Sequence, residues 1–308
     1  MTTWNRIKYQ GWNNCFCWEN QKIKMIVTSD VGPRVIFLGS PNGKNQFYEI
    51  DEEAGSTGGN DYRFYGGHRC WTAPEDKIRS YAIDNSPVDV QTKNDQLVAI
   101  APQELSGIQK TLIIENYRSE KTVKIIHQIE NKGDTPLTIA LWGLSMMHPG
   151  GTAIIPLPVK ISHSAQLTPT QSIALWGYTD ITDPRWGWGE KFLFLRQDDR
   201  MEDPQKIGVH SGQDWAAYLN SGTLFIKIAK YDSKATYPDF GSHFEFFTNH
   251  HFLELESLGG LATLHPGQKI DHVEYWALHE NIKTVISEEE VQKNILPLVD
   301  ETLHLLDQ

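Results

Sequence analysis

Cysteine is scarce in this sequence. The 308 residues contain three cysteines, Cys15, Cys17 and Cys70. An odd and small number argues against a disulfide scaffold. Cys15 and Cys17 follow the spacing C-x-C without a second pair, which is not the usual spacing of a zinc site. We therefore expect three reduced thiols in a cytoplasmic protein.

Long apolar runs and basic runs are also missing. No stretch of about 18 apolar residues is present, so we expect no membrane span. The N-terminal stretch MTTWNRIKYQGWNNCFC has no continuous apolar core and no cleavage site of a secretory signal. The formal net charge is −11 without a basic stripe, so nucleic acid is not an expected partner. We expect a monomer or a homodimer.

Several catalytic motifs are absent as well. The sequence has no G-x-S-x-G nucleophile elbow, no phosphate-binding glycine loop and no H-E-x-x-H metal motif. His250 and His251 are adjacent, so on a strand they would point to opposite sides and would not share one metal ion. The spacing of possible ligands therefore predicts no metal site.

Short strand-like segments separated by turns make up most of the chain. Examples are KIKMIVTSD, GIQKTLIIE, GTLFIKIAKY and HVEYWALHE, with turns such as SPNGKN and LHPGQK. The run TVKIIHQIE–NKGD–PLTIALW predicts a hairpin. Strands do not alternate with helices, so the predicted fold class is all-β with about 15 or more strands. We expect residues 1–308 to form one domain.

One helix is predicted near the C-terminus. Ser287 and Glu290 have the spacing of a capping box, and acidic residues fill the first turn. The helix would run through EEEVQKNILPLVDETLHLL. Pro297 lies inside this run and should kink or split it.

Aromatic residues gather in loops beside charged residues. The chain has ten tryptophans, and flat rings pack on the C–H faces of sugars while polar groups bind the hydroxyls. Packing in the core remains the simpler role for any one tryptophan. The loop YGGHRCWTAPED (65–76) offers His68, Arg69, Trp71 and Glu75 as candidate ligand-binding residues. A second loop, YTDITDPRWGWGEK (178–191), offers Asp183, Arg185 and Trp186.

A further candidate is His148, which stands where a predicted strand ends, before a Pro-Gly-Gly turn. Histidine can act as a general acid near neutral pH. A single loop histidine is more often simply exposed.

Two glutamates interrupt an apolar run near the C-terminus, FFTNHHFLELESLGG (246–260). Alternate residues of a strand share a face. Glu254 and Glu256 would therefore face one side, and Leu253 and Leu255 the other. A carboxylate buried in such a run is costly without a partner or a task. The alternation itself does not distinguish a structural glutamate from a chemical one.

Four motifs resemble, in order along the chain, those of the galactose mutarotase-like superfamily, the relatives of aldose 1-epimerases. They are SDVGPRVIFLGSPNGKN, YGGHRCWTAPED, NKGDTPLTIALWGLSMMHPGG and FLELESLGG…TLHPGQKIDHVEYW, and they look most like a bacterial branch of it. The resemblance implies a large antiparallel β-supersandwich. It also implies proton shuttling on a cyclic hemiacetal, in which a glutamate takes the anomeric proton and a histidine protonates the ring oxygen. Such a reaction needs no cofactor.

Matched position by position, the resemblance favours Glu256 as the base, with Glu254 as the alternative. The acid would be His148 or His68, while Trp142 falls near the position of the superfamily's histidine. Arg69 resembles the residue that binds sugar hydroxyls. Two further residues, Asp239 and His272, would bind hydroxyls or support the site.

The resemblance leaves several functions open. The first is an aldose 1-epimerase or mutarotase that acts on a small-molecule carbohydrate. A non-catalytic sugar-binding protein is the second, and Trp142 at a histidine position favours it. A glycan hydrolase or lyase, or an isomerase or cyclase of a non-sugar ligand, would also suit this fold.

Overall fold

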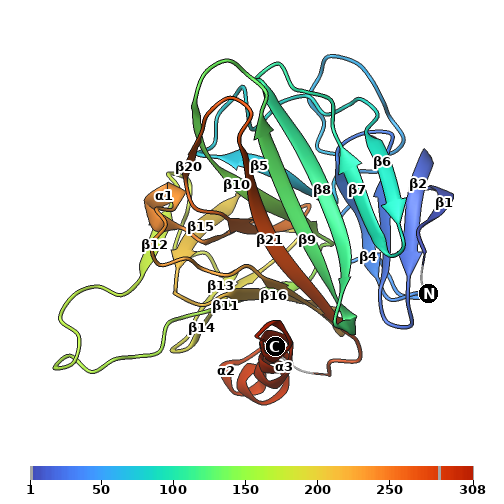
Figure 1. Ribbon diagram of the computed structural model, residues 1–308. Helices are drawn as coiled ribbons and strands as arrows, with labels where there is room; N and C mark the ends of the chain where they lie inside the picture. The colour runs from blue at the N-terminus through green and yellow to red at the C-terminus, as the bar shows by residue number, and fades with distance from the viewer. Residues whose placement is uncertain (1–2, 284–285, 308) are drawn as a thin grey trace.

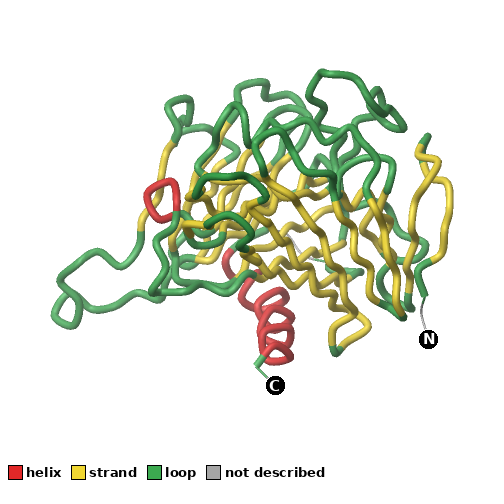
Figure 2. The backbone as a smooth tube through the Cα atoms, turned by 45° about the horizontal axis from the view of Figure 1, so that its top comes forward, coloured by secondary structure: helices red, strands yellow, loops and turns green. Residues whose placement is uncertain are grey.

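Two large antiparallel sheets pack face to face and form the body of the protein (Figure 1). The computed structural model describes residues 3–283 and 286–307. Strands fill the centre, and loops surround them (Figure 2). The prediction of an all-β fold with a short C-terminal helix is confirmed.

The first sheet has one face toward the core and one face toward solvent. In spatial order its strands are β1 (Asn5–Tyr9), β2 (Trp12–Glu19), β3 (Lys24–Thr28), β4 (Arg34–Gly39), β5 (His68–Ala73), β10 (Leu137–Met147), β19 (Leu253–Leu258), β18 (Phe244–Thr248), β15 (Gln205–His210) and β12 (Ser172–Leu175). Strand β20 (Ala262–Leu264) pairs with one end of β10. A single turn, α1 (Pro238–Gly241), precedes β18.

The second sheet lies behind the first. Its strands, in spatial order, are β13 (Trp186–Trp188), β14 (Phe192–Arg196), β11 (Thr152–Pro156), β16 (Trp215–Asn220), β17 (Thr223–Ile228), β21 (Lys269–His279), β9 (Ser119–Asn131), β8 (Ile108–Tyr117), β7 (Gln96–Ile100) and β6 (Asp89–Lys93). Side chains from both inner faces fill the space between the sheets, as in other sandwiches.

Strand β19 shows how alternation builds this core. Leu253 and Leu255 are fully buried and belong to the main hydrophobic cluster between the sheets. Glu254 and Glu256 occupy the alternate positions and therefore lie on the outer face of the first sheet. The predicted division of this strand into two faces is confirmed.

The predicted hairpin between residues 122 and 142 is wrong. Strand β9 pairs with β8 and β21 in the second sheet, whereas β10 pairs with β5 and β19 in the first. The NKGD turn therefore carries the chain from one sheet to the other. Asn131 holds this crossing, because its side-chain amide donates to the carbonyls of Thr135 at 2.9 Å and Leu264 at 2.8 Å. Alternation identified both strands but says nothing about which strand pairs with which.

The C-terminal helix covers the outer face of the second sheet. It consists of α2 (Glu288–Glu290), the π-helical segment η1 (Val291–Ile295) and α3 (Leu296–Leu306). The predicted cap is confirmed, since Ser287 Oγ accepts from the Glu290 amide at 3.3 Å. The helix changes from π to α between Ile295 and Leu296, just before Pro297, and the chain stays helical through this proline. None of the helices in the described residues is long and apolar enough to cross a membrane.

Candidate functional site

A cleft of about 390 Å³ opens on the outer face of the first sheet. Its aromatic lining consists of Phe64, Trp71, Tyr81, Trp142, Tyr178 and Phe247, with Phe252 at the turn before β19. The polar groups of the lining are Glu75, Lys206, Asn249, His251 and Glu254. A cleft that combines aromatic walls with a few polar groups is the usual form of a small-molecule site.

Strand register brings these groups together. Strand β10 lies between β5 and β19, and Leu144 stands opposite both Arg69 and Glu256. Trp142 stands opposite Trp71 in the same way. Opposed residues of neighbouring strands share a face, so the three strands present these side chains on the cleft side of the sheet.

A buried ion triad lies at the base of the cleft. Lys206 Nζ is 2.8 Å from Glu245 and 3.2 Å from Glu256, and all three side chains are buried. Trp142 Nε1 donates to the same Glu256 oxygen at 2.7 Å. Burial alone would lower the pKa of Lys206, but the charges of Glu256 and Glu245 reverse this and raise it. The triad is therefore held with its lysine charged.

Glu254 lies at the surface of this arrangement. Its side chain is half-buried and lines the cleft. Burial, and then the charge of Glu256, raise the pKa of Glu254 to about 8, against the opposing charges of Lys206 and Arg69. A carboxyl group with this pKa exchanges its proton near neutral pH.

Another part of the lining combines a carboxylate with two rings packed at a tilt. The Tyr81 hydroxyl donates to Glu75 at 2.6 Å, and the rings of Trp71 and Tyr81 are 4.9 Å apart. The Arg69 guanidinium lies 4.6 Å from the centre of the Trp71 ring. Arg69 is itself almost fully buried, so it supports the ring from below.

A second polar cluster is enclosed between the two sheets. His68 Nδ1 lies 2.8 Å from Ser145 Oγ, and His68 Nε2 lies 2.7 Å from His127 Nε2. At the centre is Glu274, which accepts from Trp276 Nε1 at 2.6 Å. Ser257 Oγ also donates to Glu274, at 2.6 Å, and Lys227 Nζ lies 3.3 Å from it. His272 Nε2 closes the network at 2.7 Å from Ser257 Oγ.

Electrostatics keep the histidines of this cluster neutral. Burial lowers the pKa of His127 to about 3 and that of His272 to about 4. Burial would raise the pKa of Glu274, but the neighbouring Lys227 holds it below its usual range. A neutral imidazole pair can share one hydrogen bond, one ring donating and the other accepting. The cluster therefore satisfies its own polar groups away from the cleft.

The same cluster contains the donor set that could hold a metal ion. Ligand atoms of His68, His127 and Glu274 all lie within 4.8 Å of one another. The two histidine nitrogens are 2.7 Å apart, whereas two nitrogens about 2.1 Å from one zinc ion at a tetrahedral angle are separated by roughly 3.4 Å. An ion would have to push the rings apart and break their hydrogen bond, so the geometry fits the hydrogen-bonded pair better.

The structure places the predicted site residues in several different locations. Trp71, Glu75, Trp142 and Glu254 line the cleft, and Glu256 and Arg69 lie beneath them. His68 and His272 belong instead to the enclosed cluster, on the opposite side of the first sheet from the glutamates. The ring of His148 is exposed just beyond the end of β10, where its Nδ1 lies 3.3 Å from the Pro149 carbonyl oxygen. Asp239 lies in α1, outside the cleft lining.

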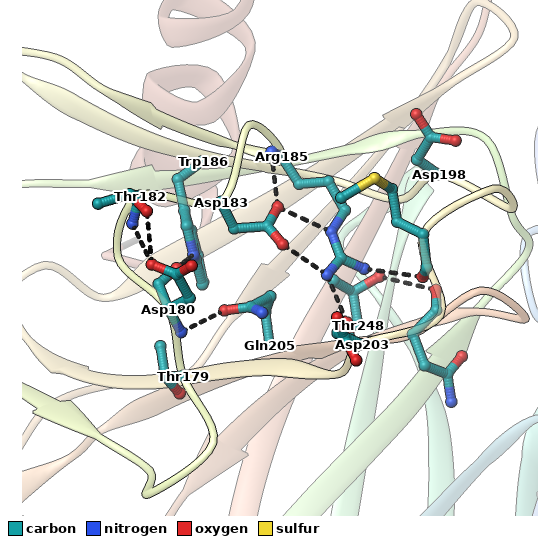
Figure 3. Close-up of polar contacts among 12 residues, drawn as sticks. Thr179, Asp180, Thr182, Asp183, Arg185, Trp186, Asp198, Asp203, Gln205 and Thr248 are labelled. Carbon is teal, nitrogen blue, oxygen red and sulfur yellow. Dashed lines mark hydrogen bonds and ion pairs between the residues drawn. The ribbon is translucent and has the colours of Figure 1, made fainter.

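The loop before β13 has a supporting position. Arg185 forms a two-pronged ion pair with Asp183, with nitrogen–oxygen distances of 3.0 and 2.9 Å, and both side chains are buried (Figure 3). Arg185 also donates to the carbonyls of Met201 and Asp203, and Trp186 Nε1 donates to the Asp180 carbonyl. These residues do not line the cleft, but the loop that they fix carries Tyr178, which does.

Substitution of Asp183 by alanine should lower the free energy of unfolding by about 1.5–3 kcal/mol, because Arg185 would remain buried without its charged acceptor. Urea unfolding followed by tryptophan fluorescence measures the loss. Asp199→Ala is the matched control, since Asp199 is exposed in a nearby loop and its replacement should change stability by no more than about 0.5 kcal/mol. Equal effects of the two substitutions would contradict a supporting role for the ion pair.

Sequence reasoning missed several groups of the site. Among them, Lys206 and Glu245 form the ion triad with Glu256, and Tyr178 and His251 line the cleft. Glu245 could have been recognised from the sequence, because it is a carboxylate within the apolar run HFEFFTN. Lys206 could not, since a single lysine in a strand usually lies on a solvated face.

Comparisons with known proteins agree with this architecture. No family model and no curated protein matches the sequence. Among solved structures, a galactose mutarotase-like protein from Lactobacillus casei is 10% identical, with a TM-score of 0.55 over 86% of this chain and 100% of its own. A proposed aldose 1-epimerase from Klebsiella pneumoniae is 9% identical, with a TM-score of 0.61 over 93% of this chain and 83% of its own.

A TPR-domain containing protein from Parabacteroides distasonis is 16% identical, with a TM-score of 0.56. The match covers 89% of this chain and 49% of that protein, so the chain spans about half of its length. These likenesses show that the chain has the galactose mutarotase-like fold, as its motifs predicted. A fold shared at such low identity does not bring an activity with it.

Proposed function

We propose that this protein interconverts the anomers of a sugar or sugar derivative by acid–base catalysis, as an isomerase of the aldose 1-epimerase type. The observation that carries the proposal is Glu254, a carboxyl group at the surface of an aromatic cleft whose pKa is raised to about 8. A general base is most effective when its pKa lies near the working pH. The faces of Trp71 and Trp142 would cover the ring of a bound sugar.

In this mechanism Glu254 takes the proton from the anomeric hydroxyl, and the bond between C1 and the ring oxygen breaks. The ring oxygen receives a proton, the C1 aldehyde rotates, and the reverse steps close the ring from its other face. His251 lines the cleft and is the proposed proton donor. Burial raises the pKa of Tyr178 to about 12, which makes it the weaker donor.

Glu256 would act as a positioning residue. Its carboxylate fixes the indole of Trp142 through the 2.7 Å hydrogen bond and is paired with Lys206. Its charge also contributes to the raised pKa of Glu254. The superfamily resemblance favours Glu256 as the base itself, whereas Glu254 is the glutamate at the surface of the cleft, and this location is why we assign the base to Glu254.

The wild-type protein should accelerate α/β exchange of some aldose, measured by saturation-transfer NMR after subtraction of the buffer rate. The base acts when deprotonated, so its ionisation should make the rate rise about tenfold per pH unit below the pKa of about 8. A rate no higher than that of buffer across a panel of aldoses and sugar phosphates would rule out the epimerase.

A sugar-binding protein without catalysis is the second candidate. The observation that favours it is the location of His148 and His68, the two histidines predicted as acids, outside the cleft. Binding of a sugar in titration experiments, without any exchange above buffer, would select this alternative.

A further inference from the structure

The charge of the cleft is one-sided. Within the described chain, its lining holds two carboxyl groups, Glu75 and Glu254, and a single lysine, Lys206. That lysine is already bound by two carboxylates, Glu245 and Glu256. Glu256 Oε1 is buried and has no hydrogen-bond partner among the described residues. The lining therefore offers a ligand the acceptors of Glu75 and Glu254 and no free lysine or arginine.

Basic residues of neighbouring loops do not compensate. Arg185 is held in its buried ion pair, and Lys191 lines a separate hollow beside the C-terminal helix. Arg63 is half-buried away from the cleft lining, and Arg69 stacks beneath Trp71. Phosphate groups are usually held by several converging arginine or lysine side chains. The described cleft offers no such cluster to a sugar phosphate.

Rings of the cleft lining already contact cations of the protein itself. Lys206 Nζ lies 4.5 Å from the centre of the Trp142 ring, and the Arg69 guanidinium lies 4.6 Å from that of Trp71. In the same lining, Glu75 accepts from Tyr81, whose ring packs against Trp71. Aromatic faces joined by a carboxylate are the usual surroundings of a bound ammonium group.

We propose that the cleft selects an unphosphorylated amino sugar, with its ammonium group held by Glu75 against the rings of Trp71 and Tyr81. This assignment of the substrate class rests on the proposed function, because it places the ligand in the same cleft. Glu254 would then accept from a hydroxyl group of the sugar. A neutral hexose has no ammonium group to pair with Glu75, and the phosphate of a sugar phosphate would lie against carboxyl groups instead of cations.

Binding by NMR titration, at a pH where the amine is protonated, tests the proposal with matched ligands. The probes are glucosamine, galactosamine and mannosamine, each against its parent hexose, its N-acetyl derivative and its 6-phosphate. At least one amino sugar should bind about tenfold more tightly than its parent hexose, the combined effect expected of a cation–π contact and a partly buried ion pair. The advantage should shrink as salt is added.

Glu75→Gln provides the second measurement. It should bring the ratio of amino sugar to hexose affinity close to one, whereas Glu190→Gln should leave the ratio unchanged, because Glu190 is exposed in a surface pair with Lys160. Equal or tighter binding of the hexose or of the phosphate by the wild type, or an unchanged ratio in Glu75→Gln, would overturn the proposal.

The two proposals can fail separately in these experiments. Accelerated exchange of a neutral hexose, without preference for its amino derivative, would support the epimerase activity and overturn the proposed selectivity for an amino sugar. Preferential binding of an amino sugar without accelerated exchange would support the selectivity and overturn the epimerase activity. Binding of none of the probes would overturn the amino sugar as well, and the exchange assay would still decide the epimerase.

Discussion

Replacement of Lys206 by methionine is expected to lower the free energy of unfolding by about 3–5 kcal/mol, because it leaves two buried carboxylates without their cation. The lysine lies 2.8 Å from Glu245 and 3.2 Å from Glu256, and neither carboxylate is exposed. The loss should become smaller as the pH falls. Burial already raises the pKa of Glu245, so without Lys206 this carboxyl group takes up a proton in the folded state more readily than in the unfolded chain.

Urea unfolding of the variant, followed by tryptophan fluorescence at several pH values, measures both effects. Lys230→Met is the matched control. Lys230 pairs with Asp307 at 3.1 Å, but both side chains are more than half exposed, so its removal should cost no more than about 1 kcal/mol. If Lys206→Met is no more destabilising than this control, the triad does not support the base of the cleft.

Substitution of Glu254 by glutamine is expected to lower kcat/KM for anomer exchange by about 10²–10⁴-fold, the usual contribution of a general base. Glutamine keeps the size of the side chain but cannot accept a proton. Saturation-transfer NMR measures the exchange rate, and the unfolding midpoint checks that the variant is folded. Glu115→Gln is the control, since Glu115 is also a strand glutamate and pairs with Lys124 far from the cleft lining.

Glu256→Gln should give a different result. It removes the second cause of the raised pKa of Glu254, so the rise of activity with pH should move to lower pH. Burial, the larger cause, would remain, and the pKa would stay above that of a free carboxyl group. A loss of activity greater than that of Glu254→Gln, without this shift, would instead make Glu256 the base.

Local patterns predicted the parts of the fold that depend on near neighbours in sequence. Period-two alternation placed Glu254 and Glu256 on one face of β19, and the capping box located Ser287 at the start of the C-terminal helix. Both features depend on contacts within a few residues. The hairpin prediction failed because pairing of β9 and β10 depends on competing strands, such as β21 and β19, that come more than 100 residues later.

The site shows the same limit. Trp71 and Glu75 follow a glycine pair, and in the structure their side chains line the cleft. His68, only three residues before Trp71, faces the interior because its strand alternates. Asp183 and Arg185 looked like ligand-binding groups and proved to be bonded to each other. Charge and residue type do not reveal whether a side chain already has a partner within the protein.

The placement of β19 and β21 in the middle of the two sheets has a consequence for synthesis of the protein. On the ribosome, β10 and β9 emerge long before the strands that must lie beside them. Until those strands arrive, the nascent chain carries open strand edges and an uncovered apolar interior, a state that is prone to aggregation. The C-terminal helix, which covers Trp215 and Ile226, arrives last of all. We therefore expect fragments truncated before residue 253 to be insoluble, and chaperones to be needed mainly while the chain is still growing.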